Sequence, residues 1–201
     1  MIRLGFCLVA IAALILQGES DDSKNFNQEK DWKTATSVYD FHAKDIDGND
    51  VSLSKYKDSV LIVVNVATNC TLTDANYEQL QKLYQTYGDA KGLKILAFPC
   101  NQFAGQEPGT PQEIKKFVKD RFNVTFDMFD KIEVNQENAH PLWKWMKSQP
   151  KGAGTNGTQD IEWNFTKFVI NKSGQVVTRF APRVEPNQMK ETLEKLFDEK
   201  V

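Results

Sequence analysis

Two cysteines, Cys70 and Cys100, stand where their sulfur atoms could do redox chemistry. Each follows an apolar, β-branched stretch typical of a buried strand, residues 61–67 and 93–98. A helical pattern begins near Thr73, just after Cys70, and the free N–H groups and dipole of a helix N-terminus stabilise a thiolate, the nucleophilic form of cysteine. The pattern predicts a reactive thiolate at Cys70; the alternative is a small cysteine packed beneath the helix.

The same two residues also allow a disulfide. Neighbouring parallel strands lie about 4.8 Å apart, so Cys70 and Cys100 at the ends of adjacent strands could be bridged. An oxidising compartment would favour that bond. The spacing leaves both states open.

Strands and helices alternate along the rest of the chain. Residues 38–43 and 51–53 alternate apolar and polar around an Asp-Gly-Asn turn, which predicts a hairpin, and residues 166–170 and 176–180 predict a second one. Helical patterns cover residues 73–87, 111–120, 141–146 and 186–197. The strand–helix–strand unit over residues 61–98 requires parallel strands. We therefore predict a three-layer α/β domain, with a mixed central sheet flanked by helices, an extra N-terminal β-hairpin, and its reactive edge at the carboxyl ends of the strands.

The N-terminal segment suggests that a signal peptide is cleaved from the chain. Residues 4–16 form an uncharged apolar run after Arg3, about 20 Å long as a helix and too short for a bilayer core of ~30 Å. Gly18-Glu19-Ser20 then fits a cleavage site, so residues 1–20 are predicted to be a secretory signal peptide. Residues 21–36 are polar and aperiodic and predict a flexible N-terminal arm, and residues 37–201 form the domain. The expected location is extracellular or the lumen of the secretory pathway.

The net charge and the composition argue against some classes of binding partner. The net charge is −2, from 25 basic and 27 acidic residues, which argues against nucleic-acid binding, and no stable membrane insertion is expected. Three cysteines are too few for a disulfide-rich scaffold. Sequons that permit glycosylation begin at Asn69, Asn123, Asn156, Asn164 and Asn171.

Motifs around the cysteines resemble the glutathione peroxidase family. They are NVATNC at 65–70, LTDANY at 72–77, ILAFPCNQF at 95–103, QEPG at 106–109, DMF at 127–129, HPLW at 140–143 and WNFTKF at 163–168. The resemblance covers residues 37–197 and implies a thioredoxin-like fold. The short stretch from Gln149 to Glu162 is similar to the phospholipid-hydroperoxide type, with cysteine in place of selenocysteine, which implies a monomer with an open site.

The resemblance implies catalytic roles. Cys70 matches the peroxidatic position, and Gln106, Trp163 and Asn164 match the residues that surround its sulfur. Each of these three side chains carries an N–H donor, and donors to a thiolate favour the charged form. Peroxide attack would leave a sulfenic acid on Cys70, which a thiol then reduces.

Glutathione is the expected co-substrate, with no bound cofactor and no metal, since His42 and His140 have no ligand spacing. Lys151 and Arg179 match positions that bind glutathione in relatives. Lys119 stands where thioredoxin-using relatives carry a resolving cysteine, so the chain reads as a one-cysteine peroxidase. Two alternatives stay open: a thioredoxin-dependent peroxidase, and a secreted non-catalytic protein with a Cys70–Cys100 disulfide.

Some residues depart from the family pattern. Thr71 replaces a common glycine, which predicts a perturbed seat for the sulfur, and Leu72 replaces a lysine found in some glutathione users. Glycans on Asn69 or Asn164 would obstruct the site, so both are expected to be unmodified. Trp143 and Trp145 are either core residues or part of a rim that admits lipid hydroperoxides, beside flexible glycines at 152–157.

Overall fold

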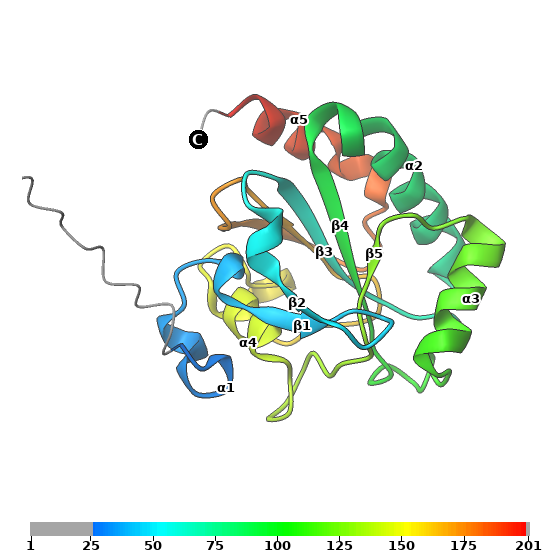
Figure 1. Cartoon of the computed structure of the whole chain (residues 1–201), viewed down its shortest axis with the longest axis horizontal. Coiled ribbons are helices and arrows are strands. Elements are labelled where there is room, and N and C mark those ends of the chain that lie inside the picture. The colour runs from blue at the N-terminus through cyan, green and yellow to red at the C-terminus, as the bar shows by residue number, and fades with distance from the viewer. Residues whose placement is uncertain (1–25, 200–201) are drawn as a thin grey trace, which may run out of the picture.

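The computed structural model describes residues 26–199, except for the side chain at position 156. A five-stranded sheet with the order β5-β4-β3-β6-β7 forms its centre (Figure 1). Strands β3 (Val60–Val66), β4 (Leu93–Pro99) and β5 (Asp127–Met128) are parallel, and β6 (Lys167–Ile170) and β7 (Val176–Phe180) run antiparallel to their neighbours. The predicted mixed sheet is confirmed. The sequence pattern missed β5, which is two residues long.

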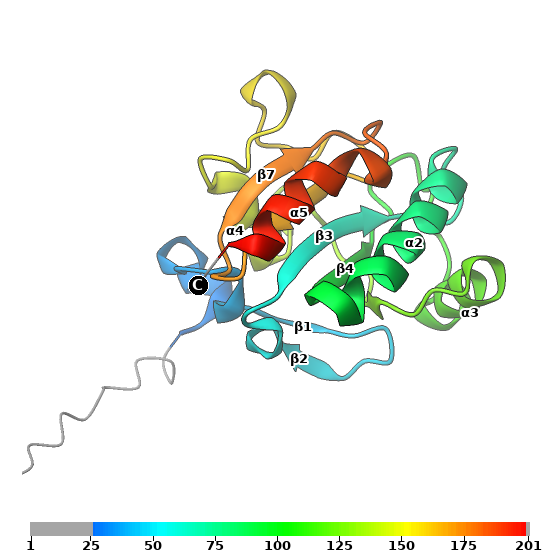
Figure 2. The ribbon, with the colours of Figure 1, turned by 90° about the horizontal axis from the view of Figure 1, so that it is seen from above.

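Helices cover both faces of the sheet (Figure 2). Helices α2 (Thr73–Lys91) and α5 (Lys190–Asp198) lie across one face, with α3 (Pro111–Phe122) beside α2. Helix α4 (Pro141–Ser148) lies on the other face, near the hairpin of β1 (His42–Lys44) and β2 (Asp50–Ser52). The sheet has an apolar cluster on each face, because alternate β3 residues point to opposite faces. Val64 belongs to the cluster on the α2 side, and Val63 to the cluster on the α4 side. This is the three-layer α/β architecture expected from the sequence.

Local signals set the helix ends. Thr110 and Glu113 form a capping box around Pro111 at the start of α3, as the sequence predicts. Helix α2 runs on to Lys91 and ends at Gly92, whose φ of 74° suits a residue without Cβ. Short 3₁₀ helices complete the element order: η3 (Val38–Asp40), η4 (Leu53–Tyr56), η5 (Thr155–Gly157) and η6 (Pro186–Met189).

The first predicted hairpin strand is shorter than expected. Ser37 and Asp40 bond reciprocally and turn residues 38–40 into η3, so β1 begins only at His42. The hairpin itself is present, with Ala43 opposite Val51.

The predicted flexible arm over residues 21–36 is wrong for its described part. Residues 28–31 form α1 and residues 32–34 form η2, and both pack against α4. Phe26 meets Phe41 edge to face at 5.9 Å, and the Trp145 indole donates to the Ala35 carbonyl at 2.9 Å. Aperiodic polarity did not reveal these contacts, because they depend on partners outside the segment, 15 positions away for Phe26 and 110 for Ala35. The predicted signal peptide, residues 1–20, lies outside the described residues. Within residues 26–199, no helix has the length and apolarity that a membrane crossing needs.

Candidate functional site

Cys70 lies beyond the carboxyl end of β3, three residues before α2 begins, and its side chain is 7% exposed. Thr73 shapes this turn: its hydroxyl donates to the Ala67 carbonyl at 2.8 Å and accepts the Cys70 N–H at 3.2 Å. The Thr73 N–H in turn donates to the Cys70 carbonyl at 3.1 Å. The predicted position of Cys70 at a strand end and helix start is therefore present.

Gln106 and Asn164 come together beside this turn, although 58 residues separate them in the chain. The Asn164 Nδ2 donates to Gln106 Oε1 at 2.8 Å, and the Gln106 carbonyl accepts the Asn69 N–H at 3.0 Å. Asn164 is fully buried and followed by Phe165, which has a φ of 62°. A non-glycine residue in the left-handed region is a strained conformation of the kind found at functional sites.

Asn65 holds the Trp163–Asn164 segment against β3. Its Nδ2 donates to the Trp163 carbonyl at 3.2 Å, and its Oδ1 accepts the Thr166 N–H at 3.0 Å. Its own carbonyl accepts the Phe165 N–H at 2.7 Å. This role of Asn65 was not predicted, although a polar residue within an apolar strand was a visible signal.

Trp163 is the one large hydrophobic residue of the described chain that is exposed, at 38%. Its ring lies 5.7 Å from that of Phe103 and forms one side of a cavity of about 480 Å³, together with Thr71 and Leu72. Glu162, Ala181, Pro182 and Arg183 complete its lining. No sequence signal pointed to Arg183, because only the fold brings it to the same cavity as Leu72. A larger cavity of about 690 Å³, between residues 45–51 and α3, does not include the cysteine turn.

The N–H donors predicted around the sulfur are near the turn but not bonded to it. No hydrogen bond to the Cys70 sulfur is present among the residues that the structure describes. Within the same residues, the Gln106 Nε2 and the Trp163 Nε1 donate to no other group. The third predicted donor, the Asn164 Nδ2, is bonded to Gln106 Oε1.

The two thiols are free and lie in different layers. Cys70 belongs to the apolar cluster on the α2 side of the sheet, and Cys100 to the cluster on the α4 side. Burial raises the pKa of the Cys100 thiol to about 11. The suggested Cys70–Cys100 disulfide is therefore wrong for this structure, and Cys100 is an inert core thiol.

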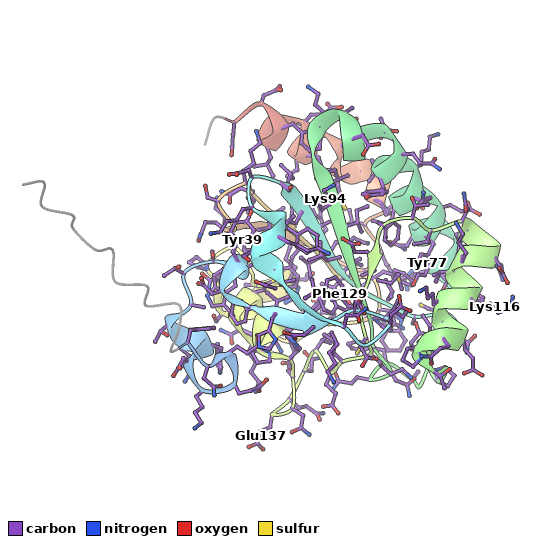
Figure 3. All side chains as sticks on the ribbon, viewed as in Figure 1. Tyr39, Tyr77, Lys94, Lys116, Phe129 and Glu137 are labelled. Atoms are coloured by element: carbon purple, nitrogen blue, oxygen red, sulfur yellow. The ribbon has the colours of Figure 1, made fainter. Side chains whose placement is uncertain are left out.

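The buried Glu107 carboxyl bonds to Thr68, two residues before Cys70. Glu107 is fully buried, and its Oε1 accepts the Thr68 hydroxyl at 2.7 Å. Its Oε2 has no partner among the described residues, and neither has the hydroxyl of buried Tyr77. Burial raises the pKa of Glu107 to about 7, and the bonds from Thr68 limit that rise. Figure 3 shows Tyr77 turned into the interior between α2 and α3, with Lys116 on the outside.

The two predicted glutathione-binding cations lie elsewhere. Arg179 is half-buried, and its guanidinium donates to the carbonyls of Gln159 at 3.1 Å and Asp160 at 2.6 Å. It therefore holds the 152–160 loop. Lys151 is exposed and does not line the cavity beside Thr71. Arg183 is the cation that the fold brings to this cavity.

The glycine rim and the two tryptophans also differ from expectation. Gly152 is buried, and a Cβ there would lie 1.8 Å from the Met146 carbonyl oxygen, so this part of the loop is tightly packed rather than flexible. Trp143 and Trp145 are 0% and 2% exposed and belong to the core. The alternative of a lipid-admitting rim built from them is therefore wrong.

Thr71 does not have the positive φ that would favour a glycine at its position. The described non-glycine residues with positive φ are Asp58, Ala104, Asn123, Gln136 and Phe165, so Thr71 has an ordinary backbone conformation. The effect of its β-branched side chain on the sulfur stays a prediction. Among the sequons next to the site, Asn69 is exposed, whereas Asn164 is fully buried and out of reach of glycosylation in the folded protein.

His140 is a structural residue. Its Nδ1 accepts the Leu142 N–H at 3.2 Å and so caps α4, and burial lowers its pKa to about 4. Among residues 26–199, no group of three or more His, Cys, Asp or Glu side chains could hold a metal ion.

The chain matches known proteins over most of its length. The family profile described as "Glutathione peroxidase" matches residues 38–147. The phospholipid hydroperoxide glutathione peroxidase of Callithrix jacchus is 54% identical over 165 residues, 82% of each chain. The crystal structure of T. cruzi GPX1 has a TM-score of 0.66 and 37% identity, and the match covers 80% of this chain and 96% of that one.

A thioredoxin family protein from Chlorobium tepidum shares the fold alone, with a TM-score of 0.55 and 17% identity, over 78% of this chain and 92% of that one. The free Cys70 thiol, the adjacent amides and the exposed tryptophan fit the same assignment. This chain therefore has a thioredoxin-like fold, belongs to the glutathione peroxidase family, in the phospholipid-hydroperoxide type, and is an oxidoreductase of the peroxidase class.

Proposed function

We propose that this protein is a secreted, thiol-dependent peroxidase that reduces hydrogen peroxide and organic or lipid hydroperoxides, with Cys70 as the nucleophile and glutathione as the reductant. The observation that carries the proposal is a free cysteine in the turn before α2, where Asn69 bonds to Gln106, Gln106 bonds to Asn164, and Thr71 lines a cavity with Trp163. The relative from Callithrix jacchus carries that substrate class in its name.

In the first half-reaction, the Cys70 thiolate attacks one oxygen of the hydroperoxide. The S–O bond forms as the O–O bond breaks, the departing oxygen takes a proton, and water or an alcohol leaves. Cys70 becomes a sulfenic acid. The Gln106 and Trp163 N–H groups are the donors available to the thiolate and to the charge on the departing oxygen.

In the second half-reaction, the sulfur of one glutathione attacks the sulfenic acid, and water leaves as the mixed disulfide forms. A second glutathione thiolate attacks that disulfide, which releases oxidised glutathione and restores the Cys70 thiol. The lack of a second cysteine beside Cys70 favours a small thiol over thioredoxin, because Cys100 lies in the other layer.

The open, partly apolar cavity supports action on bulky peroxides. Leu72, Trp163 and Pro182 present apolar surface around it, which suits an acyl chain better than water alone. A lipid hydroperoxide could thus reach the site while most of its chain stays outside. The short 149–162 segment supports a monomer, as in the type that the chain resembles.

Peroxide consumption by the purified protein tests the proposal. Cys70→Ser removes the thiolate, so turnover with glutathione is expected to fall at least about a hundredfold, the loss typical for a missing nucleophile. Cys100→Ala is the matched control and is expected to keep near-normal turnover, because that buried thiol faces the other core. Turnover that survives Cys70→Ser would exclude the assigned role.

The same assay separates the reductants. Glutathione and thioredoxin with its reductase are supplied in turn, and turnover with thioredoxin alone would favour the alternative function. No turnover with either would favour a non-catalytic protein.

Secretion is tested separately. Expression of the full chain in a cell with a secretory pathway is expected to yield extracellular protein cleaved after Ser20, as read by N-terminal sequencing. Glycan mapping is expected to find Asn164 unmodified, because its side chain is buried. Exclusively intracellular, uncleaved protein would contradict the proposed location.

A further inference from the structure

Lys167 is a buried lysine next to the proposed site. It lies on β6 opposite Val64 of β3, and its side chain is fully buried. Its ammonium donates to the carbonyls of Pro182 at 3.1 Å and Val184 at 2.5 Å. Burial lowers its pKa to about 7, and the nearby Glu185 carboxylate opposes that shift. A buried charge is costly unless it is well bonded, so these two contacts fix the segment that supplies them.

That segment forms one wall of the cavity beside Cys70. Residues 181–184 follow β7, and Ala181, Pro182 and Arg183 line that cavity together with Thr71, Leu72, Glu162 and Trp163. Figure 2 shows the loop between β7 and α5 at the same end of the sheet as the start of α2. Lys167 thus holds the segment that lines this cavity together with Thr71 and Leu72.

The two substrates would use this wall differently. Hydrogen peroxide needs only to reach the sulfur and the N–H donors. Glutathione is a tripeptide with two carboxylates, so it needs a surface with a cation, and charge-assisted hydrogen bonds are the strong ones. Arg183 is the exposed cation on the wall that Lys167 holds.

We propose that Lys167 is a positioning residue for the reducing thiol, which holds residues 181–184 so that Arg183 can bind a carboxylate of glutathione while its sulfur reaches Cys70. This role rests on the proposed function. In this proposal, the segment between β7 and α5 takes part in the reduction by glutathione and not in the reaction with peroxide.

The test measures each half-reaction alone by rapid mixing of full-length protein. Lys167→Met removes the ammonium and keeps an unbranched chain of similar length. It is expected to lower the second-order rate constant for reduction by glutathione about tenfold, the loss expected for one misplaced charge-assisted hydrogen bond. Oxidation by hydrogen peroxide, and reduction by the small neutral thiol 2-mercaptoethanol, are expected to stay within about twofold of wild type.

Lys172→Met is the matched control. Lys172 also donates to two carbonyls, those of Phe197 at 2.7 Å and Glu199 at 2.8 Å, but it lies in the β6–β7 turn at the opposite end of β6 from the cavity. Its loss is expected to change thermal stability without changing either half-reaction. An equal effect of both lysine variants on reduction by glutathione would overturn the proposal.

A double-mutant cycle tests whether Lys167 acts through Arg183. Arg183→Ala alone is expected to slow reduction by glutathione by a similar factor, and Lys167→Met added to it is expected to cost little more. Fully additive losses would overturn the proposed route, as would equal slowing of the peroxide step. If glutathione does not reduce the oxidised wild-type protein, the proposed reductant is wrong and the inference fails with it. If glutathione reduces wild type and both variants at the same rate, the proposed function stands and the inference alone fails.

Discussion

At the scale of single residues, the most unusual group is the Glu107 carboxyl. It is fully buried with one bonded oxygen, and its pKa is raised from 4.5 to about 7. Between those two values the native protein binds a proton that the unfolded chain does not, so the free energy of unfolding falls as the pH rises through this window. Glu107 therefore destabilises the fold above pH 7, where the buried carboxyl must carry a charge.

Glu107→Gln is expected to remove this pH dependence. The amide keeps an acceptor for Thr68 but carries no charge. The stability of the variant relative to wild type should thus grow by up to roughly 3 kcal/mol between pH 4.5 and pH 8, the amount that a shift of this size implies. Urea unfolding across that pH range measures it.

Glu113→Gln is the control with the opposite sign. Hydrogen bonds from Thr110 lower the pKa of the exposed Glu113 carboxyl. Its contribution is therefore present above the unfolded pKa and is lost as the pH falls. A parallel pH profile for the two variants would contradict the assignment of a buried, proton-binding Glu107.

At the scale of elements, the loop between α4 and β6 is held by backbone geometry and by Arg179. The Gly152 N–H donates to the Gln149 carbonyl at 2.8 Å, and Arg179 binds the carbonyls of Gln159 and Asp160. These contacts explain why the part of this stretch around Gly152, which suggested mobility in the sequence, is tightly packed. The order of this loop supports the placement of Trp163 at its end.

Gly152→Ala is expected to destabilise the protein by about 2 kcal/mol or more, because the new methyl group would sit within 1.8 Å of the Met146 carbonyl oxygen and the backbone must move. Gly109→Ala is the matched control, since its Cβ would meet Glu113 and Ile114 at an ordinary 3.5 Å. Urea midpoints measure both. Equal, small shifts would show that the loop accommodates the extra group.

At the scale of the whole molecule, the segment before the first hairpin is part of the packed domain. Phe26 and Trp32 cover the α4-side core, the Gln28 side chain accepts the His42 N–H at 3.0 Å, and the Trp145 indole binds Ala35. The domain therefore begins well before residue 37, the boundary that the sequence suggested.

Removal of this segment is expected to lower stability. A chain that starts at residue 36 should have a lower urea midpoint than one that starts at residue 26. Its free energy of unfolding should be lower by about 2 kcal/mol or more, because apolar area of Phe26 and Trp32 no longer becomes buried on folding. A loose arm predicts equal midpoints for the two chains.

The sequence by itself determined the longer strands and helices, from β3 through α2 and β4 to α3, and the place of Cys70 at a strand end. Those features depend on periodicity and capping within a few residues, such as the Thr110–Glu113 box and the apolar run that becomes β3. Motifs also pointed to Gln106, Trp163 and Asn164, whose catalytic roles stay a prediction.

Only the tertiary structure decided what surrounds that turn. It placed Cys70 and Cys100 in different apolar clusters, bonded Arg179 to the loop carbonyls, and brought Arg183 to the same cavity as Leu72. Each outcome depends on contacts between residues far apart in the chain. Short-range patterns carry no signal for such contacts, because burial and the choice of bonding partner are settled only when the layers pack together.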